Sequence, residues 1–354
     1  MRQKILFATN RTLTGTNGGL PQFNDVPTLP GTPISCAVAT VDGSDPGDED
    51  SGKITAMTAL NPGGFAPADL QPVLDSNNDV LVFIHGAMNT FEDSITRAAY
   101  NLSWLAQTAV EGGTARAYDL IAFSWPGRTY DLSGIAAPIN GLEGYRHDQS
   151  SAAASAAHIA ALFQLLYGLR AKMGTRRMHL LAHSMGCYAL GGAVESWFAH
   201  PGVPAQALFD EVVLAAADEE CSTFTEPDGK RLSKLQQLGR EITVYFNRND
   251  ILMHLSGIAN NAFHLGYDGP PGRAHLATFP AKVYEFVNCL ALKDYIDTDA
   301  HPEQIDHTHQ YYRQSPTVRA DIATTLAGKV PTRPFFYINE NFHAFAKIDF
   351  SGDD

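Results

Sequence analysis

The segment that decides the fold is His179-Leu180-Leu181-Ala182-His183-Ser184-Met185-Gly186, an apolar run that leads through a serine into an alanine-rich helical pattern. Small residues stand two positions before and two positions after the serine, at Ala182 and Gly186, which is the A-x-S-x-G form of a nucleophile elbow. A strand-to-helix turn this tight needs small residues, because it brings two backbones close together. It also leaves the serine hydroxyl exposed in front of the helix N-terminus. We therefore expect Ser184 to be a nucleophile, the alternative being that it only N-caps the following helix.

Short runs rich in Val, Ile, Leu and Phe alternate with helical patterns on both sides of this segment. The predicted strands are Ile5–Ala8, Cys36–Val41, Val80–Ile84, Leu120–Phe123, Met178–Ala182, Val212–Ala215, Ile242–Phe246 and Val283–Val287. The predicted helices are Phe91–Gln107, Asp148–Lys172, Met185–Phe198 and Leu232–Leu238. Because strands and helices alternate, we expect an α/β fold with a mostly parallel sheet and helices on both of its faces.

The regular alternation of apolar runs and helical patterns begins near residue 79, and we expect the chain to have three parts. Residues 1–78 are interpreted as an N-terminal extension packed on the core, 79–330 as the catalytic domain and 331–354 as a C-terminal tail. Within the extension, Gly18-Gly19 lacks a strand context for nucleotide binding and is interpreted as a loop.

A second strand end, Val82-Phe83-Ile84-His85-Gly86, resembles the His-Gly turn that follows the third strand of α/β-hydrolases. In that fold a backbone N–H group after the turn helps to bind an oxyanion. The likeness implies Ala87 and Met185 as the two oxyanion donors. His85 itself is interpreted as a packed structural histidine, because only the backbone is used here.

Several segments in a fixed order resemble a bacterial α/β-hydrolase family long catalogued as a domain of unknown function. They are FIHGAMNTFEDSITRAA (83–99), IAFSWPGR (121–128), HLLAHSMGCYAL (179–190), FDEVVLAAADEE (209–220), ITVYFNRNDILMHLS (242–256) and HQYYRQSPTVRADI (309–322). ILFATNR (5–11) also resembles the start of that family. The resemblance covers roughly residues 79–326. It is specific for the fold and for the serine machinery, and it does not specify a substrate.

The resemblance implies a catalytic triad in the chain order Ser, Asp, His. Asp250 stands where the family places its acid, and Asp218, which heads the acidic cluster Asp218-Glu219-Glu220, is the alternative. Adjacent carboxylates repel one another, so that cluster is a poor setting for the ionised group that must orient an imidazole. For the base, the family pattern of a histidine, one residue and two aromatics favours His309 over His307.

Trp125 follows a strand end and has Tyr130 and Tyr145 downstream of it. These aromatic residues could form the wall of a substrate pocket for an acyl or aryl group. The alternative is that Trp125 is packed in the core.

Composition restricts the function further. The 354 residues carry 25 Lys and Arg against 38 Asp and Glu, a net charge of −13, so nucleic acids are poor partners. Four cysteines, Cys36, Cys187, Cys221 and Cys289, lack metal-binding or disulfide-scaffold spacing. The acidic and histidine-rich segment 294–309 lacks fixed ligand spacing, and we expect no metal and no organic cofactor.

The location of the protein is predicted from its first residues and its apolar segments. Met1–Ala8 is too short an apolar run for a signal peptide, so we expect a cytoplasmic protein. The apolar stretch Ala152–Leu169 is interrupted by polar residues and is interpreted as a core helix, so no transmembrane segment is expected.

Together these features predict a serine hydrolase of carboxylic esters, acting on a small or polymeric ester through an acyl-enzyme. A related acyl-transfer enzyme, such as a thioesterase, lipase or amidase, is the first alternative. A non-catalytic binding protein on the same scaffold is the second. The sequence leaves the substrate and the oligomeric state open.

Overall fold

The computed structural model describes residues 1–48, 50–130, 137–204, 206–225, 231–271, 279–280, 282–292, 294, 308–337 and 341–345. Within these ranges one sheet of twelve strands forms the centre of the molecule. Its parallel core consists, in spatial order, of β12 (Tyr284–Asn288), β11 (Gly239–Phe246), β10 (Phe209–Ala215), β9 (Met178–His183), β7 (Asp79–Ile84), β8 (Tyr118–Ser124) and β1 (Arg2–Thr9). The mostly parallel sheet predicted from the sequence is confirmed.

Both margins of this core are extended by shorter or antiparallel strands. On one side β14 (Phe342–Ala344) pairs in parallel with β12, and β13 (Phe335–Tyr337) pairs antiparallel with β14. On the other side β4 (Ser35–Asp42) pairs antiparallel with β1, and β5 (Lys53–Met57) and β6 (Asn61–Pro62) pair antiparallel with β4. Part of residues 1–78 is therefore continuous with the central sheet.

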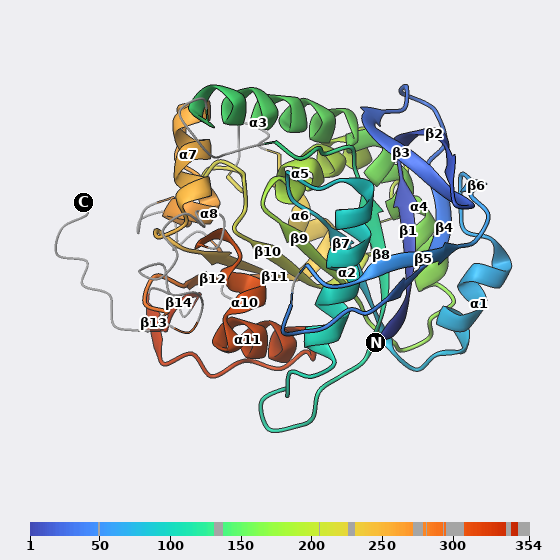
Figure 1. Ribbon diagram of the computed structural model, residues 1–354. Coiled ribbons are helices and arrows are strands. Elements are labelled where there is room, and N and C mark those ends of the chain that lie inside the picture. The colour runs from blue at the N-terminus through green and yellow to red at the C-terminus, as the bar shows by residue number, and fades with distance from the viewer. Residues whose placement is uncertain are drawn as a thin grey trace.

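The side chains of each central strand alternate between two hydrophobic cores, one on each face of the sheet. In β7, Val80, Val82 and Ile84 belong to one core, and Leu81 and Phe83 belong to the other. The first core is covered by α4 (Ala156–Arg170) and α5 (Met185–Ala199), and the second by α2 (Phe91–Leu105) and α11 (Pro316–Leu326) (Figure 1). Continuous apolar runs are needed in these strands because both faces are buried.

A hairpin of β2 (Arg11–Asn17) and β3 (Leu20–Pro27) was not predicted from the sequence, where only Gly18-Gly19 was interpreted as a loop. Its turn is Gly18-Gly19, with φ values of +57° and +83°, which glycine adopts without steric cost. Most residues of β2 are exposed, most of β3 are half-exposed, and polar residues interrupt both strands, so they lack the apolar pattern by which the buried strands were recognised.

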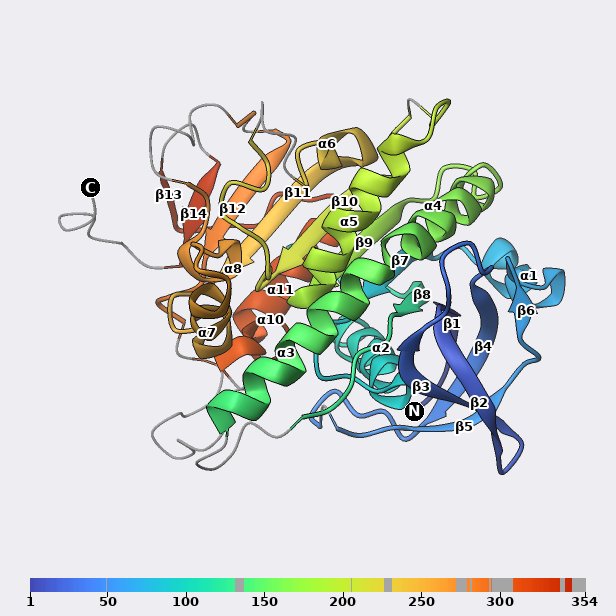
Figure 2. The same ribbon diagram turned by 90° about the horizontal axis from the view of Figure 1, so that it is seen from above.

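The predicted helix Asp148–Lys172 is divided into two. The first part, α3 (Ala137–Ala154), begins earlier than predicted and meets α4 at a 45° bend at Ser155, whose buried hydroxyl accepts a hydrogen bond from Asn10 Nδ2. Among the described residues no single helix is long and apolar enough to cross a membrane, although the bent pair of α3 and α4 together meets that criterion by length and composition. Figure 2 shows α3 crossing above α5.

The remaining described helices are short. They are α1 (Pro67–Asp75), α6 (Leu235–Leu238), α7 (Ile251–Asn260), α8 (Leu265–Asp268) and α10 (Tyr311–Gln314). All four cysteines are buried and none of them forms a disulfide.

Candidate active site

Ser184 occupies the turn between β9 and α5 in a strained backbone conformation. Its φ of 55° and ψ of −129° lie in a region that residues with a side chain rarely adopt. The turn is held by a hydrogen bond from the Ser184 amide to Ala215 O at 2.9 Å. The Ser184 side chain makes no capping hydrogen bond to α5, so the alternative of a simple helix cap does not describe it.

Two glycines make room for this turn. A Cβ atom on Gly186 would lie 2.5 Å from the carbonyl oxygens of Ile84 and His85, and one on Gly86 would lie 2.9 Å from Ser184 Cβ. The elbow and the His-Gly turn are therefore pressed together without space for a methyl group. This is the close approach that the small residues of the motif predict.

Asp250 and His309 are brought together although 58 residues separate them in the chain. Asp250 is fully buried at the start of α7, and its Oδ2 lies 2.7 Å from Nδ1 of His309. Its other oxygen, Oδ1, accepts a hydrogen bond from the Met253 amide at 3.0 Å and so caps the helix. The carboxylate thus orients the imidazole with one oxygen while the other oxygen is fixed by α7.

Asp218, the alternative acid, belongs to a different cluster. Its carboxylate accepts hydrogen bonds from Ser256 Oγ at 2.5 Å and Tyr145 OH at 3.0 Å, and it lies 2.9 Å from His264 Nδ1. Burial acts to raise the pKa of Asp218, but the hydrogen bonds from His264, Ser256 and Tyr145 outweigh it and hold that pKa below its usual value. Asp218 therefore joins α3 to α7, and its described contacts do not include His309.

The ring of His309 packs beside the elbow. It lies 4.7 Å, centroid to centroid, from the ring of His183, the residue before Ser184, and His183 in turn packs against Tyr312. Burial, and to a smaller extent the neighbouring His309, holds the pKa of His183 well below its usual value, so His183 is neutral near pH 7. Among the described contacts no hydrogen bond joins Ser184 Oγ to His309. Such a contact often tightens only when substrate is bound.

The two expected oxyanion donors lie on either side of the close approach at Gly86. Neither the Ala87 amide nor the Met185 amide donates a hydrogen bond to any described acceptor in the protein. Met88, next along the loop, has a φ of +60°, so this loop is also strained. Two unengaged amides near a serine hydroxyl could bind an oxygen that carries negative charge.

Trp125 is packed inside the protein, which was the second of the two interpretations of this residue, and it does not form the wall of an open pocket. It is fully buried, stacks on the His85 ring at 4.8 Å, and donates from Nε1 to His85 O at 2.7 Å. Burial lowers the pKa of His85 to about 3, so this ring stays neutral and serves as structure. The Trp125 side chain thus packs between the loops that follow β7 and β8, as the second interpretation expected.

Three buried polar residues near the site were not singled out from the sequence. They are Arg11, Asn89 and Asp148, which contact the backbone of the loops that follow β7 and β8. Arg11 lies within the quoted ILFATNR segment, so a signal for it was present, whereas nothing around Asp148 marks it.

His307 lies outside the described residues, as does most of the acidic segment 294–309. Within the described ranges no three His, Cys, Asp or Glu side chains are grouped to hold a metal ion.

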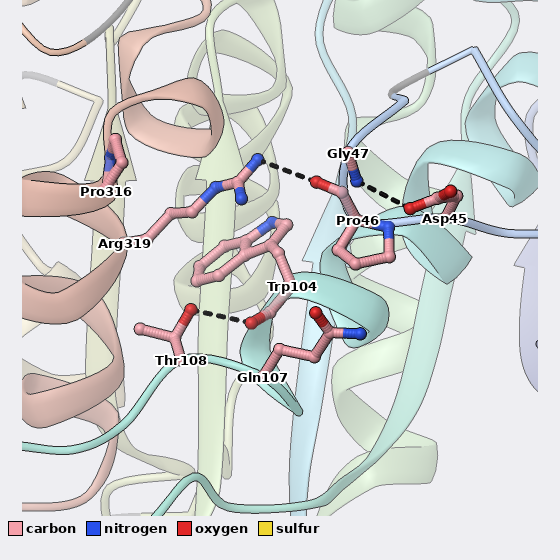
Figure 3. A pocket seen from close by; sticks show the side chains of 8 residues that line it. All are labelled: Asp45, Pro46, Gly47, Trp104, Gln107, Thr108, Pro316 and Arg319. Atoms are coloured by element: carbon pink, nitrogen blue, oxygen red, sulfur yellow. Dashed lines mark hydrogen bonds between the residues drawn. The ribbon is translucent and has the colours of Figure 1, made fainter.

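A cavity of about 570 Å³ opens elsewhere on the molecule, between α2, α11 and the loop at Pro46 (Figure 3). Arg319 reaches across it and donates from Nη2 to Pro46 O at 3.3 Å, and Trp104 forms part of its wall. It lies at the C-terminal end of α2, whereas the His-Gly turn precedes the N-terminal end of that helix. None of the proposed site residues lines it, so this cavity is separate from the candidate active site.

Residues 68–325 match the model of a family described as alpha/beta hydrolase of unknown function (DUF900). The chain belongs to this family of α/β-hydrolases. The resemblance inferred from the sequence and the α/β-hydrolase fold are thereby confirmed. The matched region contains Ser184, Asp250 and His309 and begins after Arg11. A search of curated proteins found no match to the sequence.

The solved structures that are similar to this one share little sequence identity with it. A gene product from Listeria innocua is 12% identical with a TM-score of 0.33, over 76% of this chain and 98% of that chain. Carboxyl esterase 2 from the fungus Tuber melanosporum is 12% identical with a TM-score of 0.29, over 87% of this chain and 70% of that chain. Phospholipase PlaB from Legionella pneumophila is 11% identical with a TM-score of 0.24, over 60% of this chain and 39% of that chain.

Proposed function

We propose that this α/β-hydrolase is a serine hydrolase that cleaves carboxylic esters through an acyl-enzyme. The observation that carries the proposal is the 2.7 Å contact between His309 Nδ1 and Asp250 Oδ2, beside a strained Ser184 that makes no capping bond. A carboxylate bound to one ring nitrogen leaves the other nitrogen free to accept a proton. The hydroxyl of a serine at such an elbow is the group that this base would activate.

In the proposed mechanism His309 Nε2 takes the proton of Ser184 Oγ as this oxygen attacks the ester carbonyl carbon. The amides of Ala87 and Met185 donate to the oxygen of the tetrahedral intermediate. The imidazolium, oriented by Asp250, then gives its proton to the leaving alcohol as the C–O bond breaks. Water deprotonated by the same histidine attacks the acyl group, and the intermediate collapses to the acid and free Ser184. No step requires a metal or an organic cofactor.

Burial supports this assignment of roles. Asp250 is fully buried, and His309 and Ser184 are only 3% and 5% exposed. An ion pair formed by His309 and Asp250 during the reaction is therefore shielded from water, where its electrostatic stabilisation is larger.

The experiment is a panel of p-nitrophenyl esters of increasing acyl length, assayed beside a matched anilide and a thioester. We expect ester turnover that Ser184→Ala lowers by about 10³-fold or more. Greater turnover of the thioester or the anilide than of the ester would replace ester hydrolysis by thioesterase or amidase activity. A folded wild type that turns over none of the three would favour a binding protein on this scaffold.

A further inference from the structure

Two buried side chains of opposite charge hold the loops around the His-Gly turn. Arg11, at the start of β2, is 3% exposed, and Asp148, in α3, has no exposed surface. Both residues contact the loop that follows β7 and the loop that follows β8. The hairpin and α3 therefore meet over the same two loops.

Arg11 binds the carbonyl groups of these loops. Its Nη2 donates to Asn89 O at 2.8 Å, in the first loop, and its Nη1 donates to Gly127 O at 2.9 Å, in the second. Its Nε donates to Ser124 Oγ at 2.9 Å, at the end of β8. Burial lowers the pKa of Arg11 to about 10, so the guanidinium remains charged at neutral pH. A planar group with several fixed donors suits this task, because it holds three acceptors at once.

Asp148 binds the amide groups of the same loops. Its Oδ2 accepts from the Met88 amide at 2.9 Å, and its Oδ1 accepts from the Arg128 amide at 3.1 Å. The first loop is thus held at two adjacent residues, by its Met88 amide and its Asn89 carbonyl. The anion takes the donors and the cation takes the acceptors.

Asn89 connects Arg11, through hydrogen bonds, to the peptide group that contains the expected oxyanion donor, the Ala87 N–H. While its carbonyl accepts from Arg11, its Nδ2 donates to Gly86 O at 3.1 Å and to Ala87 O at 2.6 Å. Gly86 O and the Ala87 N–H belong to one planar trans peptide group, so they point in opposite directions. Fixing that carbonyl fixes the direction in which the Ala87 N–H points.

We propose that Arg11 and Asp148 are positioning residues that aim the Ala87 amide at the oxyanion. This inference rests on the proposed function. It gives the N-terminal hairpin, which lies outside the region matched by the family model, a part in the active site. Neither side chain reaches Ser184 in its described contacts, so both act through the backbone of the loop.

The test compares Arg11→Met, Arg11→Lys and Asp148→Asn with the control Arg2→Met. Arg2 lies in the same N-terminal region but is exposed and paired only with Asp42 in its described contacts. For each protein we would measure kcat and KM with the best p-nitrophenyl ester. The burst of p-nitrophenol gives the fraction of competent serine. Affinity for an aryl boronic acid, which forms a tetrahedral adduct with the serine, reports on the oxyanion site.

We expect Arg11→Met to lower kcat per titrated site by about 10- to 100-fold and to change KM by less than about threefold. The reason is that a misdirected Ala87 N–H stabilises the transition state less, while it affects substrate binding little. Boronate affinity should fall by a similar factor, and Arg11→Lys should recover part of both losses. Asp148→Asn should lower kcat in the same way, and it serves as the test if Arg11→Met does not fold. Arg2→Met should match the wild type.

The proposal would be overturned if Arg11→Met and Asp148→Asn had the same kcat per titrated site and the same boronate affinity as the wild type. The two residues would then only stabilise the fold. A folded wild type that gives no burst and binds no boronate would overturn the proposed function, and this assignment with it. The two failures are thereby distinguished.

Discussion

At the scale of the residue, the two candidate acids differ in the partners of their carboxylate oxygens. Asp250 uses one oxygen to cap α7 and presents the other to His309. Asp218 is bound by Ser256, Tyr145 and His264. Both side chains are buried, so burial alone does not separate them. Only Asp250 lies within hydrogen-bond distance of the proposed base. Substitution of each of the two aspartates in turn therefore makes a matched comparison.

We expect Asp250→Asn to lower kcat by about 10⁴-fold at neutral pH, because an amide favours the wrong tautomer of His309. Asp218→Asn should reduce kcat by less than about tenfold while lowering the melting temperature, since it disturbs a buried hydrogen-bonded cluster. Steady-state kinetics and thermal unfolding of both variants make the comparison. The assignment of Asp250 would be wrong if Asp218→Asn showed the larger loss of kcat.

A motif in the sequence was enough to select a single residue as a candidate, whereas a role that depends on burial could not be predicted from the sequence. Asp250 and His309 were selected by their positions in family segments, and the structure places them 2.7 Å apart. The sequence did not decide whether the Trp125 side chain lies in a pocket wall or in the core, because the position of a residue in the sequence does not indicate its exposure. Asp148 was not selected, since its role depends on two loops that are distant in the chain.

At the scale of the element, the elbow depends on the distance between the β9–α5 turn and the β7 loop. Gly186 faces two backbone oxygens that a Cβ atom would approach to 2.5 Å. Backbone oxygens cannot rotate away as a flexible side chain can, so a methyl group here must displace the turn.

We therefore predict that Gly186→Ala lowers both the melting temperature and ester turnover, at a cost of about 1 to 3 kcal/mol of stability. Gly168→Ala is the matched control, because a Cβ atom at this exposed position of α4 would meet nothing within 4 Å. That variant should be as stable as the wild type or slightly more stable, since alanine favours helix. Calorimetry of both proteins tests this. Equal melting temperatures for Gly186→Ala and Gly168→Ala would contradict the close approach.

Elements with a buried apolar pattern could be predicted from the sequence, and polar elements could not. The strands from β7 to β12 read as apolar runs because both of their faces are covered. The β2–β3 hairpin was missed, since its strands are exposed or half-exposed, polar residues interrupt them, and only Gly18-Gly19 marked its turn. The bend between α3 and α4 was also missed, because the residue at the bend is Ser155 and not a proline or glycine, which would have indicated a break in the helix.

At the scale of the whole molecule, the net charge of −13 includes carboxylates placed side by side in the sheet. Glu211 in β10 is directly opposite Glu241 in β11. Burial first, and the charge of Glu241 second, raise the pKa of Glu211 to about 8. This pair lies toward the N-terminal ends of the strands, away from Ser184, so it bears on stability.

The raised pKa predicts a stability that depends on pH. Between its unfolded value near 4.5 and its folded value near 8, Glu211 holds a proton more tightly in the folded protein. Its contribution is therefore fully present below about pH 4.5 and is lost as pH rises through about 8. We expect the melting temperature to fall by several degrees from pH 6 to pH 9, and Glu211→Gln to reduce that fall. Glu143→Gln, at an exposed position of α3, should leave it unchanged. An unaltered pH dependence in Glu211→Gln would refute this account.

The central claim is that Ser184 is the acylated nucleophile, and covalent labelling tests it most directly. The wild type would be treated with a fluorophosphonate and the modified peptide located by mass spectrometry. We predict a single phosphonylated residue, Ser184, and no labelling of Ser184→Ala under the same conditions. A folded wild type that stays unlabelled, or a label that persists in Ser184→Ala, would contradict the claim.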